Sequence, residues 1–265
     1  MSTQIHPSAI IEDGANLGEG VIVGPFCHVG PDVTLGDHTK LESHVVVAGR
    51  TTIGGGCHLF PFASIGHRPQ DLKYHGEPST LEIGANTTMR EYVTVQPGTE
   101  HGGMITRVGE HCLLMASAHV AHDCQIGDHV ILGNNVMMAG HCVVENHVIV
   151  SGGSAAHQYV RLGEHAFIGG LSGVEHDVIP FGMVTGNRGR LGGLNVVGLR
   201  RRGFDREEIH TLRQAYRLLF SDEGTLAERV EDVARMFPEN ASVQRVIEFI
   251  QTRADRALCL PASVE

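Results

Sequence analysis

Two histidines and a carboxylate lie close together in the stretch 118–124, whose sequence is AHVAHDC. An imidazole can accept a proton from a hydroxyl group, and a neighbouring carboxylate can orient the ring and stabilise the imidazolium that forms. His119, His122 and Asp123 are therefore our candidate active site. A single histidine on a strand is more often an ordinary surface residue, so this interpretation depends on the elements that carry the three side chains.

An aliphatic residue recurs at every sixth position along two long segments of the chain, from Ile5 to Ile65 and from Val108 to Val174. A small residue usually follows each aliphatic residue after four positions. A fixed period of six is the hexapeptide signature of a parallel β-helix, in which each coil hydrogen-bonds to the next. Glycine is frequent, with 34 residues, and often follows the aliphatic residue directly. We expect these glycines where the chain turns sharply at a corner.

Two interruptions break the repeat, at 67–82 and 97–107. Ile83, Met89 and Val95 briefly restore the period between them, and the second interruption shifts the register by one residue. Loops that interrupt so regular a scaffold are often functional. The alternative for each loop is a tolerated insertion without a role.

The repeat ends near Pro180, which predicts a β-helix over 1–184 and a small helical domain over 185–265. A glycine-rich, arginine-rich linker comes first, and apolar residues then recur at helical intervals in about three segments. The pairs Asp205/Glu208 and Thr225/Glu228 have the spacing of helix capping boxes. These helices are expected to pack on one another and on the last coil, which would otherwise expose unpaired strand edges.

Composition excludes several classes of function. The net charge of −10 argues against nucleic-acid binding. The N-terminus lacks the pattern of a signal peptide, and no apolar run approaches the ~20 residues of a membrane span, so we expect a soluble cytoplasmic protein without stable membrane insertion. Five of the six cysteines occupy the small position of the repeat, which predicts free thiols in the core and no metal role: Cys27, Cys57, Cys112, Cys124 and Cys142.

The repeat also predicts how the candidate site is built. If three hexads make one coil, residues 18 apart stack at about 4.8 Å. Gly140 then lies over His122, and His141 lies over Asp123. The backbone N–H of Gly140 can stabilise a developing oxyanion while His122 acts as general base, a combination suited to acyl transfer to an alcohol. Cys124 is a rival nucleophile, but its inward position raises the pKa of its thiol and favours direct transfer.

Several motifs together resemble the UDP-N-acetylglucosamine acyltransferases over essentially the whole chain. In addition to AHVAHDC, they are QDLKY at 70–74, GEP at 76–78, GNN at 133–135, AGH at 139–141, HQ at 157–158 and RRGF at 201–204. The resemblance implies a homotrimer of left-handed parallel β-helices with active sites between subunits. It implies transfer of a 3-hydroxyacyl chain from acyl carrier protein to the 3-position of UDP-N-acetylglucosamine, the first step of lipid A biosynthesis. The left hand comes from the resemblance alone.

The resemblance also implies a role for each matching residue. His122 is the general base, Asp123 its partner and Gly140 the oxyanion donor. The residues that hold the acyl donor and the sugar nucleotide are Asp71, Lys73, His119, His141, His157 and Gln158. Asn195, Arg201 and Arg202 contact the nucleotide and the carrier protein, where forked cationic donors suit phosphate and acidic surfaces. Gly170 ends the acyl groove, and a glycine there fits a longer chain. No cofactor and no metal are expected.

The chain departs from the family pattern at two places, which leaves alternatives open. Val197 stands where members often carry an acidic residue, and Gln96-Pro97 stands where His-Arg is common. Some relatives acylate a 3-amino sugar nucleotide with the same base constellation, so the residues leave the acceptor atom undecided. A hexapeptide-repeat zinc enzyme of carbonic-anhydrase type and a non-catalytic β-solenoid are the alternatives from other classes.

Overall fold

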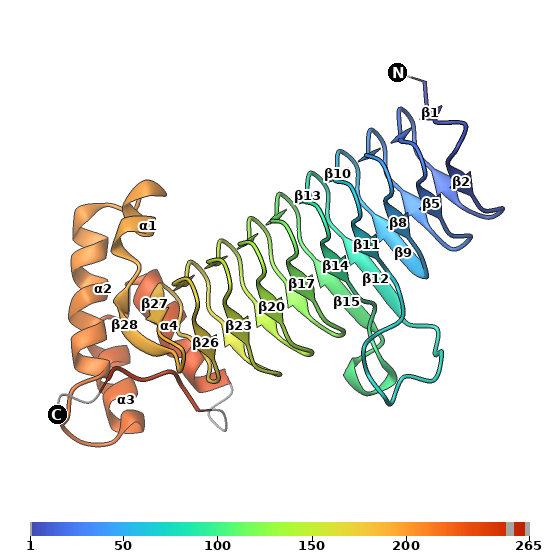
Figure 1. Cartoon of the computed structure of the whole chain (residues 1–265). Coiled ribbons are helices and arrows are strands. Elements are labelled where there is room, and N and C mark those ends of the chain that lie inside the picture. The colour runs from blue at the N-terminus through green and yellow to red at the C-terminus, as the bar shows by residue number, and fades with distance from the viewer. Residues whose placement is uncertain (1, 253–256, 263–265) are drawn as a thin grey trace.

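The structure is a computed structural model that describes residues 2–252 and 257–262. The chain winds into a long parallel β-helix whose far end is covered by helices (Figure 1). Strands on each side of the coil stack into three sheets, which we call sheets A, B and C. Most strands contain two residues, because each strand covers one flat side of the coil before the next corner.

Sheet A contains β1 (Gln4–Ile5), β4 (Ile22–Val23), β7 (Lys40–Leu41), β10 (His58–Leu59), β13 (Thr88–Met89), β16 (Leu113–Leu114), β19 (Ile131–Leu132), β22 (Ile149–Val150), β25 (Phe167–Ile168), β27 (Gly182–Thr185) and β28 (Arg190–Leu194). Sheet B contains β2 (Ile10–Ile11), β5 (His28–Val29), β8 (Val46–Val47), β11 (Ser64–Ile65), β14 (Thr94–Val95), β17 (His119–Val120), β20 (Met137–Met138), β23 (Ala155–Ala156) and β26 (Gly173–Val174). Sheet C contains β3 (Asn16–Leu17), β6 (Thr34–Leu35), β9 (Arg50–Ile53), β12 (Thr80–Ile83), β15 (Ile105–Val108), β18 (Gln125–Ile126), β21 (Val143–Val144) and β24 (Arg161–Leu162).

The register of the sheets confirms three hexads per coil. In most of the helix a residue pairs with the residue 18 positions later, as Gln125 does with Val143. Across the first loop Ser64 pairs with Thr94, so that loop preserves the hexad phase. Across the second loop Thr80 pairs with Ile105, which is the predicted shift by one residue. Because the register of the hexads is known before and after each loop, every outward side chain of the repeat can be assigned to one corner of the coil.

The interior of the coil is filled by the aliphatic residues of the repeat, as predicted. From Val23 onward every aliphatic position of the repeat is buried, whereas Ile5 at the open N-terminal end is 47% exposed. All six cysteines are buried free thiols. The Sγ of Cys124 donates to the carbonyl of Ala139 at 3.2 Å, which fits its inward position.

The glycines of the repeat mainly allow close packing between coils, which corrects our expectation. Gly66 does have a left-handed backbone, with φ of 80°. A Cβ at Gly54, however, would lie 2.6 Å from the backbone nitrogen of Ala85 on the next coil. The left-handed position at each corner is filled mostly by residues with side chains, such as Asn135 with φ of 57°. Histidine is the residue found most often at these positions, so the corner can carry outward functional groups.

The two loops project from the middle of the β-helix and lie beside each other (Figure 1). The strands resume earlier than expected, because β12 begins at Thr80 and β15 at Ile105. The second loop contains a 3₁₀ turn, η1 (Glu100–Gly102), although the sequence predicted helices only beyond about residue 185. The carboxylate of Glu77 accepts a hydrogen bond from the Glu100 N–H at 3.2 Å and so joins the two loops.

The end of the chain differs in detail from the predicted linker and three helices. β27 and β28 form an antiparallel pair in the region predicted as a linker, and α1 (Val196–Arg201) follows. The three predicted helices are α2 (Arg206–Leu219), α3 (Leu226–Met236) and α4 (Ala241–Thr252). Thr225 and Glu228 form the predicted capping box, whereas Glu208 instead accepts from the hydroxyl of Ser242 at 2.6 Å. The expected boundary at 184 falls within β27, and the division into two domains stays a prediction.

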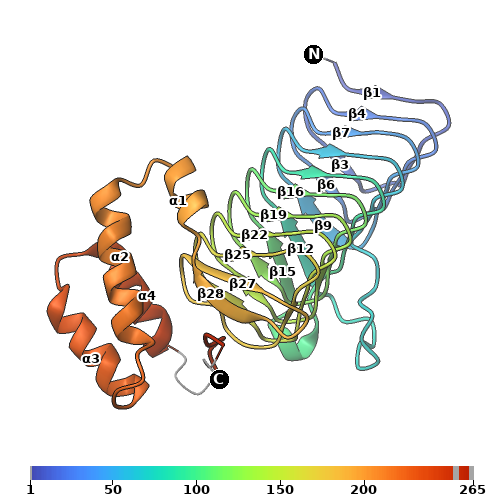
Figure 2. The same ribbon diagram turned by 60° about the vertical axis from the view of Figure 1, so that its left-hand side comes forward.

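A buried ion pair ties the last coils to the helices. The guanidinium of Arg161 donates to the carboxylate of Asp177 at 2.6 Å and to the carbonyl of Phe249 in α4 at 3.1 Å. It also lies 4.1 Å from the centre of the Phe249 ring. Figure 2 shows the helices gathered at this end of the solenoid. Within the described part of the chain, no helix is long and apolar enough to span a membrane.

Candidate active site

His122 and Asp123 lie at the corner between sheets B and C, which we call the B–C corner. Asp123 takes the left-handed backbone position there, with φ of 61°, and His141 takes it one coil later with φ of 64°. The His141 N–H donates to the carbonyl of His122 at 3.0 Å. The predicted stacking of these residues is therefore confirmed.

The histidine and the aspartate form a buried hydrogen-bonded pair. Nδ1 of His122 lies 2.8 Å from Oδ2 of Asp123, and the two side chains are 11% and 0% exposed. A carboxylate can only accept, so Nδ1 carries the proton of the neutral ring and Nε2 keeps its lone pair. The pair is thus arranged so that Nε2 can accept a proton from a bound hydroxyl group.

Asp123 stays ionised despite its burial. Burial raises the pKa of this carboxyl, but hydrogen bonds from His122 and Thr99 outweigh that effect and hold the pKa below its usual range. The Thr99 N–H donates to Oδ1 at 2.8 Å, and the Thr99 hydroxyl donates to Oδ2 at 2.6 Å. Asp123 is therefore a fixed negative charge beside Nδ1 of His122.

Gly140 lies against the imidazole of His122. A Cβ at Gly140 would lie 2.6 Å from Cε1 and 2.8 Å from Nε2 of that ring, so a side chain there would displace the histidine. Gly140 is buried, and no acceptor among the described residues receives its N–H. Buried N–H groups are almost always paired, so this free donor next to His122 is suited to an acceptor on a substrate.

Two more histidines surround the pair. The rings of His122 and His141 meet edge to face at 5.0 Å, and the ring of Tyr159 stacks on His141 at 4.4 Å. The Nδ1 atom of His119 lies 2.7 Å from the hydroxyl of Thr94. Burial and the proximity of His122 lower the pKa of His119. Burial also lowers the pKa of His141, and this effect outweighs the opposite effect of the Asp123 charge. These rings are therefore neutral at pH 7 and able to donate or accept hydrogen bonds.

The first loop brings Asp71 and Lys73 towards the same corner. Burial has the largest effect on the pKa of His141, but the charge of Asp71 raises this pKa and that of Lys73 lowers it, which indicates that both charges lie near the ring. Oδ1 of Asp71 accepts from the Lys73 N–H at 3.0 Å and closes the turn between them. The Gln70 N–H donates to the side chain of Gln96 at 3.0 Å, which ties the start of the loop to the B–C corner.

His157 and Gln158 lie on the same corner, two coils beyond His122. Both are exposed, and Nδ1 of His157 lies 3.3 Å from the Gln158 carbonyl. The B–C corner therefore carries six of the residues that the sequence predicted for the site: His122, Asp123, Gly140, His141, His157 and Gln158. His119 lies on the preceding strand β17, and Asp71 and Lys73 lie in the first loop.

Gly170 does not lie on this corner. It follows β25 and precedes β26, and so occupies the corner between sheets A and B, which we call the A–B corner. A Cβ at Gly170 would lie 3.4 Å from the Gly152 carbonyl, which agrees with the predicted stacking of these glycines. A groove that starts at His122 and ends at Gly170 cannot follow one corner of one chain.

The nucleotide candidates lie at the third corner, between sheets C and A. The Asn195 N–H donates to the carbonyl of Phe181 at this corner, and its side chain caps α1 by accepting from the Gly198 N–H at 3.1 Å. Arg202 donates to the carbonyl of His147 at 2.7 Å, whereas Arg201 is exposed at the end of α1. The structure thus gives Asn195 and Arg202 local bonds within their own chain.

Four histidines are stacked on the same C–A corner beside Arg202. The rings of His111, His129, His147 and His165 follow one another at 5.0, 4.7 and 4.7 Å. Burial lowers the pKa of His165 to about 4, and the nearby Arg202 and His147 add to the shift. None of these rings belonged to the predicted site.

The rival nucleophile Cys124 is enclosed in the core. It is 0% exposed, and its neighbour Cys142 and its burial raise the pKa of its thiol well above the usual value. A thiol in this state is neither accessible to a thioester nor ionised at neutral pH.

One group of described residues could hold a metal ion: His122, Asp123 and His141, whose ligand atoms lie within 4.8 Å of one another. The Asp123 carboxylate, however, already accepts from three donors, two of them on Thr99. A metal bound through Nδ1 of His122 would have to break one of these bonds. The donor set therefore fits a hydrogen-bonded base better than zinc.

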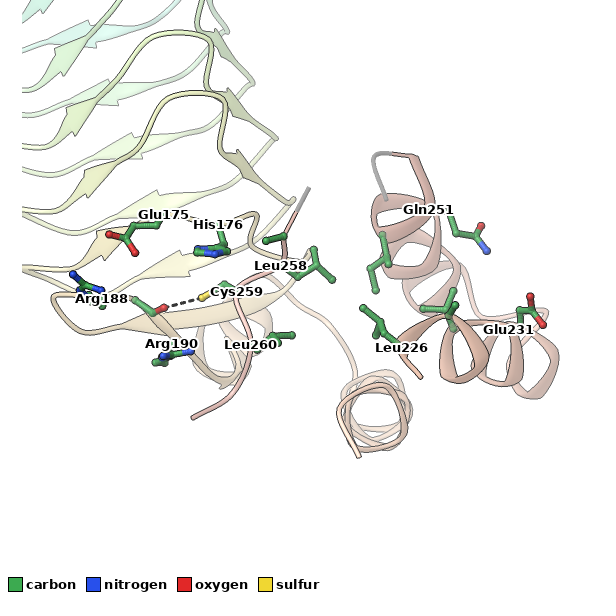
Figure 3. Close-up of a pocket in the computed structure, with 15 residues that line it drawn as sticks. Glu175, His176, Arg188, Arg190, Leu226, Glu231, Gln251, Leu258, Cys259 and Leu260 are labelled. Atoms are coloured by element: carbon green, nitrogen blue, oxygen red, sulfur yellow. Dashed lines mark hydrogen bonds between the residues drawn. The ribbon is translucent and has the colours of Figure 1, made fainter. Parts of the chain in front are cut away.

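A cavity of about 770 Å³ lies away from this corner, between β28 and helices α3 and α4. Figure 3 shows Arg188 and Arg190 on one side of it and Leu226 on the other, with Cys259 between them. It contains none of the predicted site residues.

Comparison with known proteins identifies the family. The six-repeat hexapeptide profile of bacterial transferases matches residues 14–49 and 105–140, and the profile of UDP-N-acetylglucosamine O-acyltransferase domain 2 matches residues 177–259. A protein of Methylobacterium radiotolerans named acyl-(acyl-carrier-protein)–UDP-N-acetylglucosamine O-acyltransferase is 60% identical over 98% of this chain and 96% of its own. The Rhizobium johnstonii protein of the same name is 50% identical over 98% and 96%. The chain belongs to this acyltransferase family.

Solved structures agree with that assignment. The UDP-N-acetylglucosamine O-acyltransferase of Moraxella catarrhalis is 39% identical, with a TM-score of 0.92 over 97% of this chain and 99% of its own. The Francisella novicida acyltransferase has the same TM-score at 32% identity, over 99% and 95%. The predicted fold class, a left-handed parallel β-helix followed by helices, is confirmed for this member of the family.

Sequence reasoning missed several residues of the site. Thr99 and Gly102 lie in the second loop, and Tyr159 stacks on His141. The available signal was the interruption of the repeat shortly before the AHVAHDC stretch. That signal placed a loop near the site, but it could not show which side chains of the loop face the aspartate.

Proposed function

We propose that the protein transfers a 3-hydroxyacyl chain from acyl carrier protein to the 3-hydroxyl of UDP-N-acetylglucosamine, the first step of lipid A biosynthesis, in the cytoplasm. The observation that carries this proposal is the buried His122–Asp123 pair, whose Nε2 is free and whose imidazole lies against Gly140, a residue with an unpaired N–H. The relatives with this activity in their names match the chain over nearly its full length.

The geometry supports direct transfer. Nε2 of His122 accepts the proton of the sugar hydroxyl as its oxygen attacks the thioester carbon. Asp123 stabilises the imidazolium, and the Gly140 N–H stabilises the oxyanion of the tetrahedral intermediate. The C–S bond then breaks, and the imidazolium returns the proton to the thiolate of the carrier protein. No acyl-enzyme forms, because Cys124 is buried and protonated.

We propose that the site is completed by a neighbouring subunit of a homotrimer. The base lies at the B–C corner, Gly170 at the A–B corner and Arg201 near the C–A corner, so a single chain turns these residues in different directions. In a cyclic assembly one corner of a chain faces a different corner of the next. Such a cleft can combine His122 of one subunit with groove and nucleotide contacts of another.

The proposed acceptor atom is the 3-hydroxyl oxygen of the sugar nucleotide. We propose that Asp71, Lys73, His119, His141, His157 and Gln158 hold the substrates at the B–C corner, as the family resemblance implies. These groups can bind a hydroxyl or an amino acceptor equally, so the acceptor is tested by assay.

The test is an assay of the purified protein with 3-hydroxyacyl carrier-protein thioesters and two acceptors, UDP-N-acetylglucosamine and its 3-amino analogue. We expect ester formation on the hydroxy sugar with kcat/KM at least about tenfold above that for the amino sugar. Faster amide formation would reassign the acceptor. Activity with neither acceptor, from a folded trimer, would overturn the proposed function.

A further inference from the structure

Thr99 binds the carboxylate of Asp123 with both of its donors. Its N–H donates to Oδ1 at 2.8 Å and its hydroxyl donates to Oδ2 at 2.6 Å. Thr99 is 2% exposed and the Asp123 side chain is fully buried, so water does not compete for these bonds. Oδ2 also receives Nδ1–H of His122. One residue of the second loop thus fixes both oxygens of the partner of the proposed base.

The second loop is folded around this contact. The N–H groups of Gly102 and Met104 both donate to the carbonyl of Thr99, at 3.1 and 2.9 Å. Gly102 faces the carboxylate so closely that a Cβ there would overlap the carboxyl group of Asp123. The Asp123 N–H, in turn, donates to the hydroxyl of Thr106 at 2.7 Å. The loop and the corner therefore determine one position for the carboxylate.

A second imidazole nitrogen lies near the same carboxylate oxygen. Nδ1 of His141 lies 3.8 Å from Oδ2 of Asp123, outside hydrogen-bond distance, whereas Nδ1 of His122 lies 2.8 Å from it. A small rotation of the carboxylate would exchange its partner. His122 would then lose the bond that fixes its Nδ1–H tautomer and leaves Nε2 free.

We propose that Thr99 is a positioning residue of the acyl transfer: its two hydrogen bonds hold Asp123 on His122 and away from His141. This inference rests on the proposed function for its kinetic consequence, but its structural consequence is independent of activity. Thr99 touches no substrate in this account and acts only through Asp123.

The kinetic test compares Thr99→Val, which removes the hydroxyl but keeps the branched shape, with Thr99→Ser, which keeps the hydroxyl. We expect Thr99→Val to lower kcat by about 10- to 100-fold with KM changed less than about twofold, because an interaction of the reacting state is lost. Thr99→Ser should remain within about threefold of the parent kcat. In an Asp123→Ala background, Thr99→Val should change kcat by less than about twofold, because the coupled partner is gone.

Thr87→Val is the matched control. The hydroxyl of Thr87 is also buried, donates to the Gly109 carbonyl at 2.9 Å and accepts from the Cys112 N–H at 3.1 Å, but it lies at the C–A corner. This variant should keep the parent kcat. Gly102→Ala would place a Cβ against the same carboxylate and should also lower kcat, although both donors of Thr99 are kept.

A crystal structure of Thr99→Val separates this inference from the proposed function. We expect the Asp123 carboxylate to turn towards His141, with its distance to Nδ1 of His122 beyond about 3.5 Å. If the parent protein shows no acyl transfer but the carboxylate turns, the proposed function fails and the positioning role holds. If the carboxylate stays in place, or if the Val substitution lowers kcat equally with and without Asp123, the positioning role of Thr99 is overturned.

Discussion

At the scale of single residues, the site depends on a few atoms whose surroundings assign their roles. The tautomer of His122 follows from its bond to a carboxylate that cannot donate, and the negative charge of Asp123 follows from three donors that outweigh its burial. Gly140 contributes through the absence of a side chain, because a Cβ would meet the imidazole. Each role can be removed by one substitution.

Cys124→Ala tests whether the thiol takes part in catalysis. The sulfur is enclosed in the core and burial contributes to raising its pKa, so we expect kcat within about threefold of the parent, together with a modest loss of stability of about 1 kcal/mol from the smaller side chain. Steady-state kinetics and a urea titration measure the two effects. An inactive but folded variant, or an acyl group trapped on the protein by mass spectrometry, would refute direct transfer.

At the scale of elements, the coil corner is the unit that positions chemistry. The left-handed position carries Asp123, His141 and Tyr159 at one corner and the stacked histidines at another. Side chains at this position leave the coil at the same angle, so those 18 residues apart stack. The same rule that places His141 beside His122 places His147 beside His165.

His165→Phe tests the electrostatics of the histidine stack. The folded-state pKa of His165 is about 4, below the value near 6.5 of an exposed histidine, so between these pH values only the unfolded chain takes up this proton. The parent protein should therefore lose about 2 kcal/mol of unfolding free energy through this group between pH 7.5 and pH 5. Phenylalanine, which cannot be protonated, should reduce the loss.

The measurement is a pair of urea titrations at pH 7.5 and pH 5, at the same protein concentration for both proteins. The other titrating groups are shared, so the difference between the two pH-dependent losses isolates His165. An equal loss in the parent and in His165→Phe would show that the buried imidazole does not carry the pH dependence.

Much of this arrangement could be predicted because the repeat fixes the phase. The hexads predicted that Gly140 lies beside His122 and that the Cys124 side chain points into the coil, because each position of the hexad points its side chain in one fixed direction. The six-residue repeat cannot predict side-chain directions in the segments that interrupt it. The contacts of Thr99 depend on the path of an irregular loop, and α1 lies where glycine and arginine gave no helical period.

The glycines show the limit of reasoning from residue type. Glycine suggested left-handed corners, but positions such as Gly54 are needed because the next coil passes too close for a Cβ. That requirement depends on the neighbouring coil, and the local sequence pattern cannot predict it.

At the scale of the whole molecule, the proposed residues occupy three corners of one solenoid. His122 and Gly170 lie at two different corners, and Arg201 ends α1, where the next residue, Arg202, bonds to His147 at the third corner. A complete site therefore requires an assembly in which corners of different chains face each other. A trimer with cyclic symmetry meets this requirement.

Mixed trimers of His122→Ala and Arg201→Ala test the shared cleft. If each cleft takes His122 from one subunit and Arg201 from its neighbour, random mixing of equal amounts restores about a quarter of the clefts. Activity measured on co-expressed, doubly tagged trimers should then rise well above that of either variant alone. Activity no greater than the average of the two variants would mean that one chain supplies both residues.

Gly170→Met tests the proposed end of the acyl groove. Each buried methylene contributes about 0.8 kcal/mol, so a methionine that fills the space of about four carbons should cost the longest donor about 3 kcal/mol and spare a shorter one. The kcat/KM values for a series of 3-hydroxyacyl carrier-protein thioesters should shift towards short chains. A uniform loss across the series would make Gly170 a backbone requirement instead.

His122→Ala, assayed with UDP-N-acetylglucosamine as the acceptor, tests whether His122 is the general base of acyl transfer. Release of free carrier protein and formation of the acylated sugar nucleotide are measured together, with the trimer and the melting temperature checked for the variant. We expect kcat to fall by about 10²- to 10⁴-fold, with KM for the sugar nucleotide changed little. A folded His122→Ala protein that retains the parent kcat would contradict the account.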